Sequence, residues 1–270
     1  MKLVAVTVHF TNPAQTTQLL AALLSNDSID KVVVVIHGPY STRPEHTNLI
    51  FLESENRGYG AGLNLAFRHI RENIPDTDLI LALNPDAQIS GTQIPQLVHA
   101  HLQAESDCTF PAVIEGTSAI HGYDFGRFGT VRRVVKNADF YPATCFLITP
   151  EAWHRANGFD EGYFHYFEDA DFCLRLKKTG CKIHHAADVA VQHIGKSGMD
   201  YPATELPRYA VRNHLLFLSR IGKMNALTFI NVAVRQLLYL FRWNRPWRGF
   251  AQWLAGIREF YRLAVGTDRN

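Results

Sequence analysis

Residues 158–176 read GFDEGYFHYFEDADFCLRL and place three carboxylates within four positions, directly after a run of aromatic residues. The three carboxylates are Glu168, Asp169 and Asp171. Apolar residues at helical spacing follow, and the sequence Lys-Lys-Thr-Gly at 177–180 is typical of the end of a helix. The pattern therefore predicts that the acidic cluster lies in the first turn of a helix.

Two interpretations of this acidic cluster stay open from its residues alone. Carboxylates are stabilised in a first helical turn by the free N–H groups and the helix dipole, and Asp171 and Arg175 have the spacing of a surface ion pair. The aromatic residues around Glu168 and Asp169 indicate partial burial instead. Buried carboxylates without a partner are costly, and where they occur they often carry out chemistry.

The composition is that of a globular chain with an uneven charge distribution. Of 270 residues, 47% are hydrophobic and 19% are charged, which allows a sizeable core and excludes a disordered protein. Residues 1–199 carry 16 Lys and Arg against 21 Asp and Glu, a net charge of −5. Residues 200–270 carry 11 against 4, a net charge of +7, which indicates a negatively charged partner for this segment.

The cysteines and the N-terminus predict a cytoplasmic protein. The four cysteines form no paired motif and are interpreted as core thiols of a reducing compartment. Residues 1–8 are a short apolar run without a signal-peptide cleavage site. No stretch of about 18 uncharged apolar residues is found. Peripheral attachment to the inner face of a membrane stays open.

Apolar strands alternate with helices along the chain. Strands are predicted at residues 3–10, 31–36, 49–53, 79–83, 141–149, 181–184 and 189–193. Helices are predicted after Asn12-Pro13, a cap followed by a proline at the first helical position, and at residues 60–70. This alternation predicts an α/β fold with a mostly parallel sheet flanked by helices.

Two segments follow strands, where ligands bind in parallel sheets. Residues 56–64, NRGYGAGLN, carry glycines that let a backbone approach a phosphate, although a tight glycine turn explains them equally. Residues 84–87, NPDA, place Asp86 directly after a strand, where one carboxylate can hold a divalent ion shared with phosphates. A plain Asn-Pro-Asp turn is the alternative.

Two features lie further along the chain. Residues 112–140 contain four glycines and four basic residues, and they are predicted to form a mobile lid, an acceptor-side insertion or an irregular surface loop. His193 ends a predicted strand just before a Gly-Lys-Ser turn, where an imidazole can bind a metal or face a phosphate.

Taken in order, these motifs resemble those of the family 2 glycosyltransferases, inverting enzymes with the GT-A fold, and most of all the bacterial rhamnosyltransferase-type members and the related galactofuranosyltransferases. The matching segments are residues 56–64, 84–86, 158–161 with 166–171, and 193–197. The resemblance implies a GT-A catalytic domain at 1–199, with a nucleotide-sugar half at about 1–110 and an acceptor half at about 111–199, followed by a C-terminal amphipathic helical segment at 200–270.

The resemblance also implies roles for the matching residues. Asp86 is the chief ligand of a divalent Mg²⁺ or Mn²⁺ ion, and His193 completes the metal site. Asp169 is the catalytic base, which takes a proton from the attacking acceptor hydroxyl. The donor pocket is expected to contain Arg57, Gly58, Gly60, Asn64 and Asn84, and the acceptor pocket Glu168, Asp171 and Tyr166.

The chain departs from the family pattern at two positions. The family usually carries an Asp after the second strand, in contact with the nucleotide, whereas this chain has His37 there. Ala143 stands where a glycine is common. Neither change removes the base or the main metal ligand, so we expect an active enzyme. The family pattern does not assign its donor nucleotide.

Residues 200–270 are predicted to form helices in which tryptophan and arginine accompany a large apolar face. Trp243, Trp247 and Trp253 lie there among Arg242, Arg245, Arg248 and Arg258. This composition fits an anionic membrane surface and, equally, a helical packing or homodimer interface. Nucleic acid is not an expected partner because the basic residues are interleaved with the apolar face.

The predicted function is metal-dependent inverting transfer of a sugar, with rhamnose as the first candidate, from a nucleotide-diphospho-sugar to a cell-surface glycan or lipid-linked precursor. Galactofuranose or a UDP-hexose is the alternative donor. A catalytically inactive scaffold that binds a sugar nucleotide is the alternative of a different class. An NAD-dependent dehydrogenase is more distant, because the glycine motif follows the third strand rather than the first.

Overall fold

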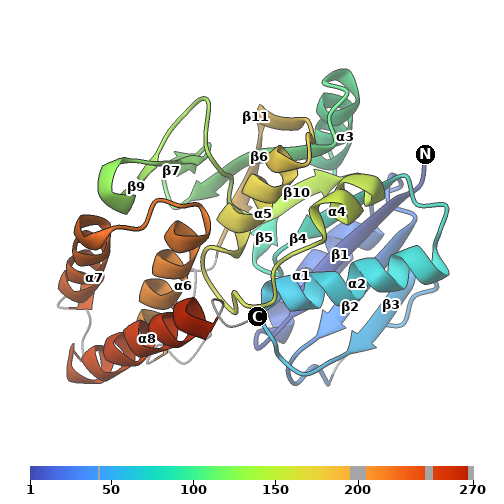
Figure 1. Cartoon of the computed structure of the whole chain (residues 1–270). Helices are drawn as coiled ribbons and strands as arrows, with labels where there is room; N and C mark the ends of the chain where they lie inside the picture. Colours follow the sequence, from blue (N-terminus) through green and yellow to red (C-terminus); the bar gives the residue numbers. More distant parts are fainter. Residues whose placement is uncertain (42, 195–204, 241–245, 267–270) are drawn as a thin grey trace.

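The computed structural model describes residues 1–41, 43–194, 205–240 and 246–266 (Figure 1). Within these residues a nine-stranded sheet has the order β3-β2-β1-β4-β10-β6-β11-β5, with β7 paired to β6. Its strands are β1 (Leu3–His9), β2 (Lys31–Ile36), β3 (Leu49–Glu53), β4 (Leu79–Leu83), β5 (Ala87–Gln88), β6 (Cys108–Glu115), β7 (Ser118–Ile120), β10 (Cys145–Ile148) and β11 (Ile183–His193). The predicted α/β fold is confirmed.

Helices cover both faces of the sheet because its central strands are apolar on both sides. Val4 and Val6 of β1 pack into one core with α2 (Tyr59–Asn73), α4 (Pro150–Ala156) and α5 (Glu168–Lys178). Leu3 and Ala5 of the same strand pack into a second core with α1 (Pro13–Leu24) and α3 (Gln93–Gln103). Successive side chains of a strand point to opposite faces, so one continuous apolar run supplies both cores.

The helix starts follow the capping signals in the sequence. The Asn12 side chain accepts a hydrogen bond from the Gln15 N–H, and Pro13 occupies the first turn of α1. The acidic cluster lies in the first turn of α5, as predicted. The strands β1, β2, β3 and β4 are mutually parallel.

The strand predicted at 141–149 is shorter in the structure. Only Cys145–Ile148 forms β10, which is antiparallel to both β4 and β6. Pro142 lacks an N–H for the ladder, and the Thr144 carbonyl accepts a hydrogen bond from the Asn84 N–H at 2.9 Å. The residues before β10 therefore turn away from the sheet and line a cavity described below.

The segment 112–140 is partly ordered into strands, which corrects the interpretation as an irregular loop. It contains the end of β6, all of β7, and a hairpin of β8 (Tyr123–Phe125) with β9 (Val131–Arg133). Phe140 stacks on Tyr123 and Phe125, with ring centroids 5.1 and 5.0 Å apart. This aromatic packing joins the glycine-bearing segment to the main core.

Three helices, α6 (Leu206–Arg220), α7 (Ala226–Leu240) and α8 (Pro246–Gly266), form a group at one end of the molecule (Figure 1). Helix α6 is part of the main core, where Leu215, Phe217 and Leu218 are fully buried. Arg208 of α6 forms an ion pair with Glu259 of α8. None of the described helices is both long and apolar enough to cross a membrane.

Candidate active site

A cavity of about 720 Å³ lies beyond the carboxyl ends of β1, β2 and β4. It is bounded on one side by residues that follow these strands and on the other by the first turn of α5 and by helices α6 and α7. The predicted site residues that line it are Gly58, Asn84, Asp86, Tyr166, Glu168, Asp169 and His193. Folding therefore brings one candidate base and two candidate metal ligands to a single cavity.

The pairing of β5 with β11 places Asp86 beside His193. His193 is opposite Ala87 in the antiparallel register, and the Ile194 N–H donates to the Asp86 carbonyl at 3.0 Å. His193 Nε2 consequently lies 3.0 Å from Asp86 Oδ2. The second carboxylate oxygen, Asp86 Oδ1, is buried without a hydrogen-bond partner among the described residues.

Glu115 completes this cluster, and sequence reasoning missed it. The parallel register of β6 and β11 sets Glu115 opposite His193, with the carboxylate 3.4 Å from Nδ1. Burial lowers the pKa of His193, but the carboxylates of Asp86 and Glu115 outweigh burial and raise it overall. No strand is predicted at β6, because residues 112–140 are interpreted as a lid, insertion or loop; the apolar run just before Glu115 was the available signal.

Asp86 and His193 offer ligand atoms for a divalent cation whose other ligands come from a substrate. One carboxylate and one imidazole, with Asp86 Oδ1 unsatisfied, suit Mg²⁺ or Mn²⁺ when phosphate oxygens supply the other ligands. Over the described ranges, no group of three or more His, Cys, Asp or Glu side chains forms a complete metal site. The residues therefore fit a metal that a phosphate-bearing substrate helps to hold.

Helix α5 presents its first two carboxylates to the cavity from a strained turn. Tyr166 and Phe167, directly before the helix, both have left-handed backbone conformations, with φ of 68° and 69°. Asp169 Oδ1 accepts a hydrogen bond from the Ala170 N–H at 2.8 Å, whereas Glu168 Oε2 is buried without a partner among the described residues. The turn thus delivers two carboxylates to a desolvated position.

Burial raises the pKa of both carboxyls of this pair. For Asp169, hydrogen bonds from the backbone N–H groups of Ala170, Asp169 and Ala143 partly offset the effect of burial. For Glu168, burial raises the pKa and the charge of Asp169 raises it further. The two carboxyls titrate as a pair, and the hydrogen bond that Asp169 accepts, set against the unpartnered Glu168 Oε2, favours the state with Asp169 ionised and Glu168 protonated.

We expect Glu168→Gln to lower kcat by less than about tenfold near neutral pH, because a protonated Glu168 and a glutamine are both neutral there. A general base contributes roughly 10²–10⁴-fold, so Asp169 and Glu168 are readily distinguished. A pH profile of kcat in Glu168→Gln should keep its acid limb, at a pH above the ordinary aspartate pKa of 3.8. If Glu168→Gln is inactive while Asp169→Asn is active, Glu168 rather than Asp169 is the base.

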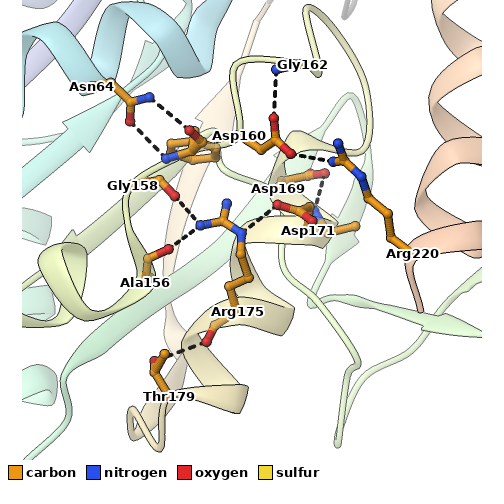
Figure 2. A network of polar contacts seen from close by, with 12 residues as sticks. Asn64, Ala156, Gly158, Asp160, Gly162, Asp169, Asp171, Arg175, Thr179 and Arg220 are labelled. Carbon is orange, nitrogen blue, oxygen red and sulfur yellow. Dashed lines mark hydrogen bonds and ion pairs between the residues drawn. The ribbon is translucent and has the colours of Figure 1, made fainter. Parts of the chain in front are cut away.

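A network of polar contacts holds α5 against the loop that precedes it (Figure 2). Arg175 Nε donates to Asp171 Oδ2 at 2.7 Å, and the guanidinium also donates to the carbonyls of Gly158 and Ala156. Asn64 of α2 holds the same loop, because it accepts from the Phe159 N–H and donates to the Phe159 carbonyl, both at 2.9 Å. These contacts position the helix turn that carries Asp169.

Four of the predicted site residues do not line the cavity. Asp171 and Asn64 are occupied by the network just described. Arg57 is 68% exposed and pairs with Glu161 at 2.9 Å. A side chain at Gly60 would meet the Phe159 ring. These residues contact other parts of the protein in the structure, and their predicted contacts with donor or acceptor stay predictions.

A glycine is required at position 58 because the backbone of Phe164 passes close to it. Its φ of 97° disfavours other residues, and a Cβ there would lie 2.4 Å from the Phe164 carbonyl oxygen. We expect Gly58→Ala to lower the free energy of unfolding by roughly 3 kcal/mol, measured by urea denaturation. Gly116→Ala is the matched control, because Gly116 also has positive φ but no atom lies within 4 Å; it should cost only about 1 kcal/mol. An equal loss of unfolding free energy in both variants would contradict the role of this close approach.

His37, which replaces the expected aspartate, follows β2 and lines the cavity. Burial lowers its pKa to about 4, with a smaller contribution from His9. Its Nε2 is buried without a hydrogen-bond partner among the described residues. The imidazole is therefore neutral at physiological pH and presents an unsatisfied polar atom.

Two curated relatives share part of the sequence, while no family profile matches the chain. The rhamnosyltransferase WbbL of Escherichia coli K12 is 25% identical over a 166-residue alignment that covers 52% of this chain and 62% of that protein. The low-salt glycan biosynthesis hexosyltransferase Agl10 of Haloferax volcanii is 23% identical over 162 residues, 55% of this chain and 52% of that protein. The matches thus span little more than half of each relative.

Solved glycosyltransferase structures share the fold. GalNAc-T7 with UDP, GalNAc and Mn²⁺ has a TM-score of 0.61 at 11% identity, over 81% of this chain and 48% of that chain. The mannosyltransferase PcManGT from Pyrobaculum calidifontis, with GDP-Man and Mn²⁺, has a TM-score of 0.57 at 14% identity, over 100% of this chain and 76% of that chain. The fold is therefore that of the GT-A glycosyltransferases. Together with the two relatives, it confirms the predicted resemblance to the family 2 glycosyltransferases.

Proposed function

We propose that the protein transfers a sugar from a nucleotide-diphospho-sugar to a hydroxyl of a cell-surface glycan or lipid-linked precursor, with inversion at the anomeric carbon. Rhamnose is the first candidate, since one relative is named a rhamnosyltransferase. The observation that carries the proposal is the arrangement of one cavity: a buried carboxylate pair, Glu168 and Asp169, shares it with the Asp86–His193 pair. Such a cavity offers a base to an acceptor and cation ligands to a donor.

Asp169 is the base in this mechanism. An acceptor hydroxyl is a weak nucleophile, so a carboxylate has to remove its proton as the oxygen attacks the anomeric carbon. The raised pKa of Asp169, caused by burial, makes the carboxylate a stronger base than an exposed aspartate. A single displacement needs only this one base, and the anomeric configuration then inverts.

Asp86 and His193 would hold the donor diphosphate through a shared divalent cation. When bound, a cation of this kind stabilises the negative charge that gathers on the leaving diphosphate. His193 has to be neutral to act as a ligand, so its raised pKa predicts competition between protons and metal at acid pH. His37, neutral and unsatisfied, is placed to donate or accept a hydrogen bond with the nucleotide.

The test is hydrolysis of dTDP-, UDP- and GDP-linked sugars by the full chain, with and without Mn²⁺ or Mg²⁺. We expect metal-stimulated release of one nucleoside diphosphate by the wild type and loss of that release in Asp169→Asn. Asp188→Asn is the matched control, because Asp188 is an exposed aspartate of β11 outside the cavity. Absence of binding to every nucleotide diphosphate and nucleotide sugar would overturn the proposal.

A further inference from the structure

Helix α7 exposes a continuous apolar stripe. Leu227, Ile230, Val234 and Leu238 are 64%, 56%, 46% and 59% exposed. Their spacing of three and four residues puts them on one face of the helix, opposite the buried Val232, Ala233 and Leu240. Isolated apolar residues on a surface are ordinary, whereas a stripe along a whole helix marks a site of interaction.

Helix α8 carries further exposed apolar residues. Phe250 and Tyr261 are also exposed large hydrophobic residues. The Tyr261 ring lies 5.7 Å from the ring of Phe229 on α7, and the Trp253 indole N–H of α8 donates to the Ala233 carbonyl of α7 at 3.1 Å. The two helices are therefore joined into one unit at the end of the molecule (Figure 1). We call the exposed residues of this unit, Leu227, Ile230, Val234, Leu238, Phe250 and Tyr261, the apolar platform.

Basic side chains without acidic partners accompany the apolar platform. No ion pair between described residues involves Lys223, Arg235, Arg258 or Arg262. The only acidic residue between 206 and 266 is Glu259, and it already pairs with Arg208 and Arg212. The surface thus combines apolar side chains with uncompensated positive charge, the combination that binds an anionic lipid surface.

The apolar platform and the active-site cavity share helix α7. Arg235, Gln236 and Tyr239 of α7 line the cavity, and Arg235 directly follows Val234 of the stripe. Tyr239, which is 55% exposed, directly follows Leu238. Helix α7 therefore carries both the main part of the platform and part of the cavity wall.

We propose that the apolar platform lies on an anionic lipid surface and that the cavity opens there to a lipid-linked acceptor. The part of this proposal that concerns the acceptor rests on the proposed function; the lipid contact does not. A second copy of the chain fits the surface less well, because a two-fold interface would bring the unpaired Arg235, Arg258 and Arg262 of both copies together without acidic residues to balance them.

The test is flotation of the purified full chain with phosphatidylcholine vesicles that contain or lack phosphatidylglycerol. We expect binding to the vesicles with phosphatidylglycerol, weakened by salt. Ile230→Gln combined with Leu238→Gln should reduce binding at least about tenfold. Arg258→Gln combined with Arg262→Gln should reduce it about fivefold for each lost charge. Leu102→Gln on α3, which also replaces an exposed apolar residue, should leave binding unchanged.

Vesicle binding is measured without a nucleotide sugar, and donor hydrolysis is measured without vesicles, so failure of one proposal is distinguished from failure of the other. Absence of flotation with either vesicle would overturn the lipid proposal. A dimer in solution that the Ile230→Gln and Leu238→Gln pair dissociates, with no vesicle binding by the wild type, would assign the platform to a second copy instead. Thermal unfolding of each variant shows that the exposed substitutions leave the fold intact.

Discussion

Replacing Asp169 by asparagine is expected to lower kcat by on the order of 10³-fold, because the amide cannot accept the acceptor's proton. Asparagine has the shape of aspartate and keeps an oxygen for the Ala170 N–H, so the turn into α5 is retained. The proposed base is identified by the rate of transfer, or of donor hydrolysis, measured with saturating donor and metal.

The same substitution is expected to stabilise the fold. Burial raises the pKa of Asp169 in the folded state above its ordinary value. A carboxyl of this kind destabilises the folded state at pH values above its unfolded pKa, and the penalty is complete above its folded pKa. The gain in thermal stability of Asp169→Asn should therefore be larger at pH 8 than at pH 5.

Asp171→Asn is the matched control, since Asp171 lies two residues further along the same helix. Its carboxylate accepts a hydrogen bond from Arg175, so the substitution should lower stability by roughly 1–3 kcal/mol, with a much smaller loss of kcat. A loss of stability in Asp169→Asn that accompanies its loss of activity would show that Asp169 is a structural residue.

Replacing Asp86 by alanine is expected to abolish stimulation by Mn²⁺ and to lower kcat by roughly 10²–10³-fold, the cost of removing one preorganised group that stabilises developing charge. Two properties make Asp86 the critical ligand: its unpartnered Oδ1 and its position 3.0 Å from His193. Binding of Mn²⁺ with a nucleoside diphosphate, followed by electron paramagnetic resonance, gives a measurement that is independent of turnover.

The control for this experiment is Asp188→Ala, an exposed carboxylate on the same strand as His193. It should leave both Mn²⁺ binding and kcat unchanged. Wild-type Mn²⁺ affinity in Asp86→Ala would place the cation elsewhere and would contradict the assignment of Asp86 and His193.

For the C-terminal segment 200–270, local sequence patterns predict the helices but not which side chains are exposed. Its helices were predicted from sequence, and the open choice between a membrane surface and a protein interface came from its Trp and Arg residues. Trp243, Arg242 and Arg245 lie outside the described residues, and so do Gly195, Lys196 and Ser197 of the motif after His193. Most of the platform consists of aliphatic residues of α7 such as Leu227 and Ile230, whose exposure depends on which face of α7 packs against α6 and α8.

The sequence alone determined the alternation of strands and helices, the start of α1 at Asn12 and Pro13, and the acidic first turn of α5. These features depend on apolar period, capping and turn residues, which act over a few neighbouring positions. The contact of His193 with Asp86 and Glu115 depends on strand pairing, and the raised pKa values of Glu168 and Asp169 depend on burial. Register and desolvation are set by residues far apart in the chain, so only the tertiary structure decided them.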